Sequence, residues 1–318
     1  MADIEQDRSL IEGALQAEKY AIARLISVFE DPRPAAIQRR AAVLEYLREY
    51  STRQARFLGI TGTPGSGKST LIGEIANRLI RNDDQLRVAI LAVDPSSHVS
   101  GGSILGDRMR TRFPLDEKRL YFRSQASDRE LGGVSRSTFQ VCRFLHYLFD
   151  FVLIETVGIG QNEIEIQYVA DRIYLVLQPL GGDQIQFMKA GIMEIPDVFI
   201  INKYDKTEAA DQSYHALKAS LAYARPGETE RIRIIRTSAI TGRGLDEWCD
   251  EIRSVDSEAA RHNMSEKEVY YFHRWVRDEY GRTGLRYLED MLGGNVAFMK
   301  QCAGFENAQQ TFRRRLRY

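Results

Sequence analysis

The sequence has few cysteines and no excess of charge of either sign. Its three cysteines, Cys142, Cys249 and Cys302, are odd in number and far apart in the chain. That spacing disfavours a disulfide framework or a cysteine zinc site and favours reduced thiols. Forty-four basic and forty-four acidic side chains cancel, so no overall field would attract nucleic acid or an anionic membrane. We therefore expect local recognition of partners, with no nucleic acid and no membrane among them.

Long apolar runs, internal repeats and low-complexity linkers are also missing. The opening residues, MADIEQDRSL, lack the basic-then-apolar form of a secretion signal, and no run approaches the length of a membrane span. Together with the cysteine usage, these absences predict a cytoplasmic protein. The chain has 318 residues, of which 43% are hydrophobic and 28% charged, enough for one large α/β domain with helical additions.

The hydrophobic pattern changes twice along the chain. Apolar residues recur at helical spacing from about Glu5 to Glu30, where EDPRP ends the run, and a second helix is expected over residues 35–50. Seven β-rich runs then alternate with helical or loop stretches: Arg56–Ile60, Val88–Val93, Leu120–Arg123, Phe151–Ile154, Ile173–Leu177, Val198–Ile201 and Ile232–Ile235. The alternation predicts an α/β fold whose mostly parallel sheet carries helices on both faces and ligands at its carboxyl edge.

The stretch GITGTPGSGKST, residues 59–70, joins the first expected strand to an expected helix over residues 71–79. It contains the phosphate-loop pattern, in which backbone N–H groups surround a phosphate, Lys68 reaches the β and γ oxygens, and the Ser69 hydroxyl ligates Mg²⁺. The helix adds its positive N-terminal end. A glycine-rich turn that binds nothing is the alternative, but strand, loop and helix all agree with nucleotide binding. The expected nucleotide contacts here are Gly62, Thr63, Pro64, Gly65, Ser66, Gly67, Lys68, Ser69 and Thr70.

A second segment, Asn202-Lys203-Tyr204-Asp205, directly follows the expected strand 198–201. In the Asn-Lys-x-Asp pattern the aspartate accepts from N1–H and the exocyclic amine of guanine, while the lysine stem lies along the purine ring. Adenine offers no matching pair of donors, so it would leave the carboxylate unpaired. The pattern alone also fits an ordinary polar loop, but Thr237-Ser238-Ala239 supplies the other half of a base pocket. We predict guanine contacts from Asn202, Lys203, Asp205, Ser238 and Ala239.

In a third segment, the expected strand 151–154 ends in Glu155-Thr156-Val157-Gly158. We expect the Gly158 N–H to meet the γ-phosphate and Glu155 to reach Mg²⁺ through water. Common GTPases carry Asp in place of the Glu, and often a water-orienting Gln directly after the Gly. This chain has Ile159 there and Gln161 farther on, so slow intrinsic hydrolysis is expected. Gln161 is either catalytic or the start of a helix.

Asp94 and Asp107 are further candidates for binding Mg²⁺ or positioning water. Asp94 closes the strand 88–93, at the same sheet edge as the phosphate loop, and Asp107 follows a Ser-Gly-Gly stretch that can move as a switch loop must. Each could instead cap a turn or a helix. The predicted metal ligands are Ser69, Asp94, Asp107 and Glu155. The predicted catalytic residues are Lys68, Asp94, Asp107, Glu155 and Gln161.

Three stretches, VDPSS…GGSILGDRMR, ETVGIGQNE and GGDQIQFMKAGIMEIPDVFIINKYD, resemble the MeaB/ArgK-type G-protein chaperones of adenosylcobalamin-dependent acyl-CoA mutases, relatives of the methylmalonic aciduria type A protein. The resemblance is close over residues 56–239, with Asp94, Asp107, Glu155 and Lys189 at matching motif positions. It implies a P-loop NTPase fold of the SIMIBI type, GTP or GDP with Mg²⁺, and slow GTP hydrolysis. It also implies gated loading or protection of a mutase whose own cofactor is adenosylcobalamin.

The resemblance leaves the substrate of the partner mutase open. LGDRMR, IGQNE and NKYDK also resemble the G-domain of fused isobutyryl-CoA mutases. The partner would therefore act on methylmalonyl-CoA or on a branched four-carbon acyl-CoA such as isobutyryl- or 2-hydroxyisobutyryl-CoA. An adenosyltransferase is a further candidate partner. Phe187 departs from the family, which commonly has a small residue there in its third switch, and this leaves the partner contacts open.

The C-terminal part of the chain is expected to be helical and to form a homodimer. Ser265-Glu266-Lys267-Glu268 has the form of a capping box. The apolar residues beyond it exceed what a helical appendage readily buries, although packing back on the same sheet is the alternative. They are Val269, Phe272, Trp275, Val276, Tyr280, Leu285, Leu288, Met291 and Leu292. The resembled chaperones pair through C-terminal extensions, which favours the dimer. We predict an N-terminal helical extension (1–55), a P-loop GTPase domain (56–255) and a C-terminal helical dimerisation extension (256–318).

Three other functions remain open. A metal-insertion GTPase of the same P-loop branch would need a Cys/His cluster near the switches, where the sequence has only His98. A small-molecule kinase would use the phosphate loop but would not need Asn202 to Asp205. A scaffold without catalysis would tolerate the loss of Lys68.

Overall fold

The computed structural model describes residues 2–94, 116–126, 134–156, 161–179, 192–228, 231–255 and 263–316, with the side chains of residues 2–6, 94, 126, 161–164 and 192 left undescribed. The chain forms two compact units. The helical unit comprises Met1–Arg53, Arg136–Leu148 and His262–Tyr318, and the sheet unit comprises Gln54–Ser135 and Phe149–Arg261. The N- and C-terminal segments therefore belong to one unit, together with a helix from the middle of the chain.

In the described part of the sheet unit, seven strands form one sheet in which every neighbouring pair is parallel. They are β1 (Arg56–Gly62), β2 (Val88–Asp94), β3 (Leu120–Ala126), β4 (Phe151–Thr156), β5 (Arg172–Leu177), β6 (Val198–Ile201) and β7 (Arg233–Arg236). Their order is β3-β2-β4-β1-β5-β6-β7, so β1 is central. This confirms the predicted α/β fold with a parallel sheet. The order reverses beside β1, which places a ligand crevice at its carboxyl end.

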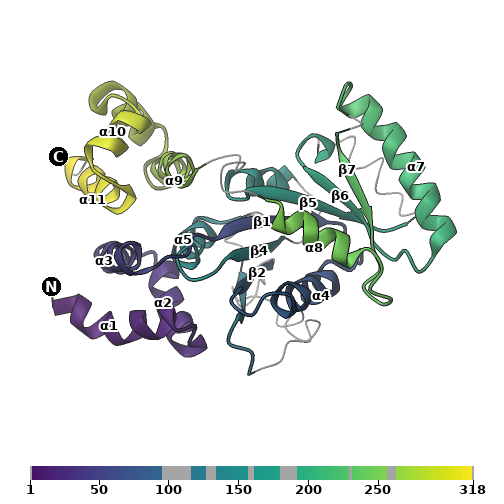
Figure 1. The fold of residues 1–318 in the computed structure, drawn as a ribbon. Coiled ribbons are helices and arrows are strands. Elements are labelled where there is room, and N and C mark those ends of the chain that lie inside the picture. Colours follow the sequence, from purple (N-terminus) through teal and green to yellow (C-terminus); the bar gives the residue numbers. More distant parts are fainter. Residues whose placement is uncertain are drawn as a thin grey trace, which may run out of the picture. The chain divides into compact units, whose positions relative to one another are not determined.

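Helices cover both faces of this sheet (Figure 1). On one face, α4 (Lys68–Arg81) and α8 (Leu245–Arg253) share an apolar cluster with Val198 and Ile200 of β6. On the other face, α7 (Thr207–Ala224) and the short η2 (Ile192–Glu194) share a second cluster with Phe199 and Ile201. Because successive residues of β6 point to opposite covered faces, the strand is a continuous apolar run rather than an alternating one.

Gly59 in β1 allows a close approach by the 3₁₀ helix η1 (Gln161–Tyr168). A Cβ atom at Gly59 would lie 2.6 Å from Cδ1 of Ile166 and 3.0 Å from Cβ of Ala170. Any larger side chain would therefore push η1 away from the central strand. The segment that follows β4 is in this way packed directly against the strand that leads into the phosphate loop.

The helical unit contains α1 (Ala2–Leu15), α2 (Lys19–Glu30), α3 (Pro34–Tyr50), α5 (Arg136–Leu145), α9 (Met264–Leu292), α10 (Asn295–Gln301) and α11 (Phe305–Leu316). The single helix expected over residues 5–30 is wrong, since α1 and α2 are separate. Ala17 has a left-handed backbone (φ 60°), and the N–H of Glu18 donates to the carbonyl of Gly13 at 2.9 Å. That bond closes α1 in the manner of a helix C-cap, which apolar spacing alone does not reveal.

The capping box of α9 lies two residues earlier than predicted. Asn263 is the N-cap: its Oδ1 accepts from the N–H of Glu266 at 3.0 Å, and Glu266 Oε2 accepts from the N–H of Asn263 at 3.0 Å. Ser265 lies inside the helix. Gly281 (φ 60°, ψ −150°) interrupts the helical backbone, so α9 consists of two helical pieces joined by a kink.

Four of the nine apolar residues named for the C-terminal part, Phe272, Trp275, Val276 and Leu288, are buried within the helical unit of one chain. The Phe312 ring of α11 lies 5.2–6.1 Å from the rings of Phe272, Trp275 and Tyr280 in α9 and of Phe298 in α10. One chain therefore buries Phe272 and Trp275, contrary to the prediction that it could not. The homodimer itself stays a prediction.

A buried ion cluster joins α5 to the C-terminal helices of the same unit. Arg143 of α5 donates to Glu268 of α9 (2.7 and 2.9 Å) and pairs with Glu306 of α11. Burial disfavours the charge of Arg143, but attraction to Glu306 and Glu268 outweighs it and raises the pKa of the guanidinium. Arg143 also lies 4.8 Å above the ring of Phe305. A fully buried cation is thus matched by two carboxylates and an aromatic face.

The three cysteines form no disulfide with one another, as predicted. Burial raises the pKa of the Cys249 thiol to about 11. Within the described parts of the chain, no helix has the length and apolar character that a membrane span requires.

Candidate nucleotide-binding site

The phosphate loop runs from the end of β1 to the start of α4, and its glycines are sterically required. Gly62 (φ 144°) and Gly67 (φ 90°) both have positive φ. A Cβ at Gly62 would lie 2.0 Å from the carbonyl oxygen of Val176, and one at Gly67 would lie 2.5 Å from Nδ2 of Asn202. The loop can therefore lie between β5 and Asn202 only with glycine at both positions.

Lys68 is the first residue of α4, and its buried ammonium lies inside the loop. The Nζ atom donates to the carbonyls of Gly62 at 2.7 Å and Thr63 at 3.0 Å. A buried ammonium needs such acceptors, because its desolvation is otherwise costly. These bonds hold the positive charge at the N-terminal end of α4, where the helix dipole also favours an anion.

Ser69 and Glu155 bring a hydroxyl and a carboxylate together at the carboxyl edge of the sheet. The Ser69 Oγ donates to Oε1 of Glu155 at 2.7 Å. Glu155 is buried near the end of β4, where it pairs in register with Ile60 of β1. Oxygen atoms of this kind are the ligands that Mg²⁺ prefers, so the pair fits a magnesium site beside the loop.

Four buried hydroxyls at this edge have no hydrogen-bond partner within the described residues. They are the side chains of Thr61, Thr63, Ser66 and Thr156. Buried polar groups are normally hydrogen-bonded, and here all four lie in the loop or at the ends of β1 and β4. A polyphosphate with its hydrated metal ion would offer partners to such hydroxyls. The residues present therefore fit a nucleotide with Mg²⁺.

The first predicted base loop, residues 202–205, is attached directly to the phosphate loop. Asn202 Nδ2 donates to the carbonyl of Ser66 at 2.7 Å, although the two residues are 136 positions apart. Lys203 has a left-handed backbone (φ 61°), and its Nζ donates to the carbonyl of Gly65 at 2.8 Å and to Oε1 of Gln178 at 3.0 Å. The two side chains together connect the ends of β5 and β6 to the loop.

The second predicted base loop, residues 237–239, lies beside Asp205. Ser238 Oγ donates to Oδ1 of Asp205 at 3.1 Å, and Thr237 Oγ1 lies 3.5 Å from Oδ1 of Asn202. The N–H of Tyr204 donates to the carbonyl of Thr237 at 2.9 Å. Asp205 itself is exposed, which leaves its carboxylate accessible to a ligand.

Some predicted site residues lie outside the described residues. Those without any description are Asp107, Gly158, Phe187, Lys189 and His98. Asp94 ends β2, with its side chain undescribed, and Gln161 is the first residue of η1, likewise without its side chain. In the described part of the chain, no three His, Cys, Asp or Glu side chains gather as they would around a metal ion.

The sequence patterns missed Gln178, Thr61 and Thr156. Gln178 follows β5 and accepts from Lys203, while the two threonines lie at the ends of β1 and β4. Each is a polar residue at the carboxyl end of a strand adjacent to the phosphate loop, and that position was the available signal. The arrangement can hold a charged polyphosphate at the loop, a divalent cation at Ser69 and Glu155, and a purine between the two base loops.

Comparison with known proteins agrees with this geometry. A family model described as "Methylmalonyl Co-A mutase-associated GTPase MeaB" matches residues 22–279. The GTPase ArgK of Escherichia coli is 35% identical over 280 residues, which cover 86% of this chain and 83% of that protein. The mouse protein named methylmalonic aciduria type A homolog, mitochondrial, is 35% identical over 271 residues, covering 80% of this chain and 64% of its own.

One solved structure extends the likeness to the whole fold. The crystal structure of an LAO/AO transport system kinase superposes with a TM-score of 0.62 at 22% identity, covering 99% of this chain and 98% of that one.

Proposed function

The chain belongs to the MeaB family of methylmalonyl-CoA mutase-associated GTPases, and we propose that it is a GTP-hydrolysing switch that acts on a partner mutase. In this proposal its nucleotide state gates the loading of adenosylcobalamin into the mutase and protects or reactivates that enzyme. The resemblance of the three sequence stretches and the names of the relatives support the partner class. The arrangement of the two loops supports the nucleotide.

One observation carries the choice of GTP. The Asn202 side chain bonds to the Ser66 carbonyl at 2.7 Å, and Asp205 beside it is held by Ser238 at 3.1 Å. A base bound at Asp205 would therefore belong to the same ligand as a phosphate bound at the loop. A carboxylate at that position matches the two N–H donors of guanine and not the edge of adenine.

Each residue of the loop has a distinct part in this mechanism. Lys68 binds the β and γ oxygens from inside the loop, and the start of α4 stabilises the same negative charge. Ser69 and Glu155 would hold Mg²⁺, directly and through water, and the ion would supply positive charge to offset that of the phosphates. Asp94 and Asp107 are proposed to join this ligand set and to orient water, and Gln161 is a further candidate for the water.

Loss of the γ-phosphate is proposed to change the contacts of the switch segments with the mutase. Such a change requires that the partner bind the two nucleotide states with different affinity. We further propose that the protein is a cytoplasmic homodimer. Its partner would be a mutase for methylmalonyl-CoA or for a branched four-carbon acyl-CoA, with an adenosyltransferase as a second partner.

A binding experiment tests the proposal. The purified protein, loaded with GDP or with a non-hydrolysable GTP analogue, is immobilised and incubated with extract of the source cells, and retained proteins are identified by mass spectrometry. We expect an adenosylcobalamin-dependent acyl-CoA mutase whose retained amount differs at least about threefold between the two states. Protein incubated with ATP in place of a guanine nucleotide is the control for base specificity. Equal retention in both states, or no mutase in either, would contradict the switch.

A further inference from the structure

Tyr204 occupies the variable position of the Asn-Lys-x-Asp pattern and is buried, whereas the neighbouring Asp205 is exposed. Its ring belongs to the apolar cluster between the sheet and α7, and its N–H bonds to Thr237 at 2.9 Å. The left-handed backbone of Lys203 precedes it. Tyr204 is therefore the buried anchor of the loop that presents Asp205.

Arg243 connects this anchor to the second base loop. Its guanidinium carbon lies 4.1 Å from the centroid of the Tyr204 ring, and its Nη2 donates to the Tyr204 hydroxyl at 3.4 Å. Its own carbonyl accepts from the N–H of Ser238 at 3.0 Å. One residue thus contacts Tyr204 through its side chain and Ser238 through its main chain. A guanidinium over an aromatic ring is an attractive, orientation-dependent contact.

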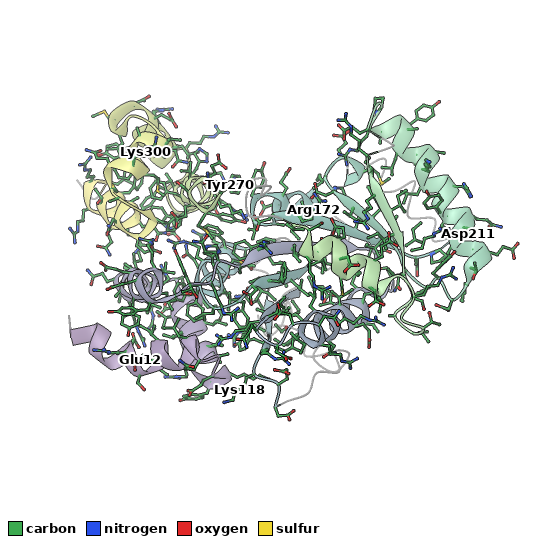
Figure 2. All side chains as sticks on the ribbon, in the orientation of Figure 1. Glu12, Lys118, Arg172, Asp211, Tyr270 and Lys300 are labelled. Carbon is green, nitrogen blue, oxygen red and sulfur yellow. The ribbon has the colours of Figure 1, made fainter. Side chains whose placement is uncertain are left out.

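A second arginine completes the cluster. The Arg236 guanidinium lies 5.1 Å from the Tyr204 ring and 5.0 Å from the Tyr214 ring. It pairs with Asp211 of α7 at 2.6 Å, and the Tyr204 hydroxyl lies 3.4 Å from the same carboxylate (Asp211 is labelled in Figure 2). The cluster therefore ties β7 and α7 to the ring of Tyr204.

We propose that Tyr204 and Arg243 are positioning residues that determine how well the site distinguishes guanine from other purines. This inference rests on the proposed GTP binding. Asp205 must meet two donors of guanine at once, and paired hydrogen bonds to a carboxylate are geometrically demanding. The described contacts of its carboxylate include only the 3.1 Å bond from Ser238, so the loop backbone sets its position. Loosening Tyr204 would let Asp205 shift relative to Ser238, so that its carboxylate would no longer meet both guanine donors at once.

Inosine diphosphate (IDP) isolates the bond from the exocyclic amine of guanine to Asp205, because hypoxanthine keeps N1–H but lacks that amine. Titration calorimetry of nucleotide-free protein with GDP and with IDP gives the ratio of the two affinities. For the wild type we expect GDP to bind about 10- to 100-fold more tightly, as one bond to a charged acceptor predicts. In Tyr204→Ala and Arg243→Ala that ratio should fall at least about threefold, with GDP affinity falling more than IDP affinity.

The chain offers a matched control. Tyr214 also stacks on Arg236 and packs against the same apolar cluster, but no hydrogen bond described for it reaches either base loop. Tyr214→Ala should therefore leave both affinities within about twofold. Tyr204→Phe keeps the ring and removes only the hydroxyl, so the ratio should largely be retained, and Arg243→Lys should restore it in part because a lysine also attracts the ring.

A merely structural role would lower both affinities or the melting temperature without changing the ratio. Circular dichroism and thermal melting of each variant distinguish that outcome. Arg243 is exposed, so if Tyr204→Ala does not fold, the affinities of Arg243→Ala test the inference in its place. An unchanged GDP to IDP ratio in a folded variant overturns the inference and leaves GTP binding intact. A wild type that binds ADP as well as GDP would instead overturn the proposed function.

Discussion

The Oγ atom of Ser69 lies 2.7 Å from Oε1 of Glu155, so the start of α4 is hydrogen-bonded to the end of β4. Ser69 belongs to the phosphate loop motif, and Glu155 lies 86 residues farther along the chain. The contact places the hydroxyl and the carboxylate that we propose to hold Mg²⁺ on the same side of the loop. Lys68, next to Ser69, instead lies inside the loop, so we expect Lys68 and Glu155 to have separable effects on binding and turnover.

Lys68→Ala should weaken nucleotide binding, whereas Glu155→Ala should chiefly lower turnover. In the proposed site Lys68 contacts phosphate in the ground state, so its removal should raise the Kd for GTP by roughly 10- to 100-fold. Glu155 is proposed to act through Mg²⁺, so its removal should lower kcat by about 10²-fold or more while Kd changes little. Single-turnover phosphate release and equilibrium titration measure the two effects. Wild-type turnover in both variants would leave hydrolysis at this site without support.

Asp205→Asn should change the preferred base. An amide cannot accept from both donors of guanine, so GTP affinity should fall by roughly 10²-fold. Xanthosine triphosphate has a carbonyl in place of the amine, so its affinity should rise. Competition of each nucleotide against a fluorescent GDP analogue measures the change. Glu208→Gln is the matched control, because it makes the same change of charge on an exposed side chain in the first turn of α7. The same loss for both variants would contradict a specific role for Asp205.

Gly67→Ala should destabilise the loop more than Gly65→Ala does. Both glycines have positive φ (90° and 77°), so each alanine carries backbone strain of about 1–2 kcal/mol. Only at Gly67 would the new Cβ also lie 2.5 Å from Asn202, whereas nothing lies within 4 Å at Gly65. We expect Gly67→Ala to break the bond from Asn202 to Ser66 and to lower GTP affinity further. Equal affinities for the two variants would show that the loop adapts to the added methyl group.

The Arg143 cluster should make the helical unit sensitive to acid. Burial alone would raise the pKa of Glu306, but attraction to and hydrogen bonds from Arg143 outweigh it and lower the pKa below its ordinary 4.5. A carboxylate with a lowered pKa stabilises the fold at pH values above the ordinary pKa, and this stabilisation is lost as pH falls through the lower folded value. The free energy of unfolding should therefore decrease below about pH 4.5.

Glu306→Gln tests this dependence. Removing one partner of a buried pair should cost about 3 kcal/mol at pH 7, and the decrease below pH 4.5 should become shallower. Urea unfolding at several pH values, with Glu289→Gln on the exposed surface of α9 as control, measures both effects. An unchanged pH profile in Glu306→Gln would assign the acid sensitivity to other groups.

Substitution of Met291 and Val296 tests the predicted homodimer. They are 70% and 53% exposed near the junction of α9 and α10, in contrast to the buried Phe272. If the C-terminal helices pair, Met291→Glu with Val296→Glu should convert the dimer to a monomer, because two charges would enter an apolar interface. Light scattering at micromolar concentration measures the mass. Tyr223→Glu, 91% exposed on α7, is the control. A wild-type monomer would contradict the dimer outright.

The sequence by itself determined the strands and the two nucleotide motifs. All seven β-rich runs became strands within three residues at either end, since both faces of the sheet are covered and each strand is a short, largely apolar run. The phosphate loop and the Asn-Lys-x-Asp segment are equally local, because each is a run of consecutive residues with a defined backbone requirement.

Only the tertiary structure decided which of these segments meet. The bond from Asn202 to Ser66 spans 136 positions, and the cluster of Arg143 with Glu306 spans 163. Residue spacing records the face that a segment buries, but not the partner that covers it. The aromatic C-terminal helices therefore suggested an interface with a second chain, whereas the fold packs many of those side chains around Phe312. In the same way, the break at Ala17 depends on a left-handed backbone and a bond to Gly13, which the apolar pattern of α1 and α2 does not contain.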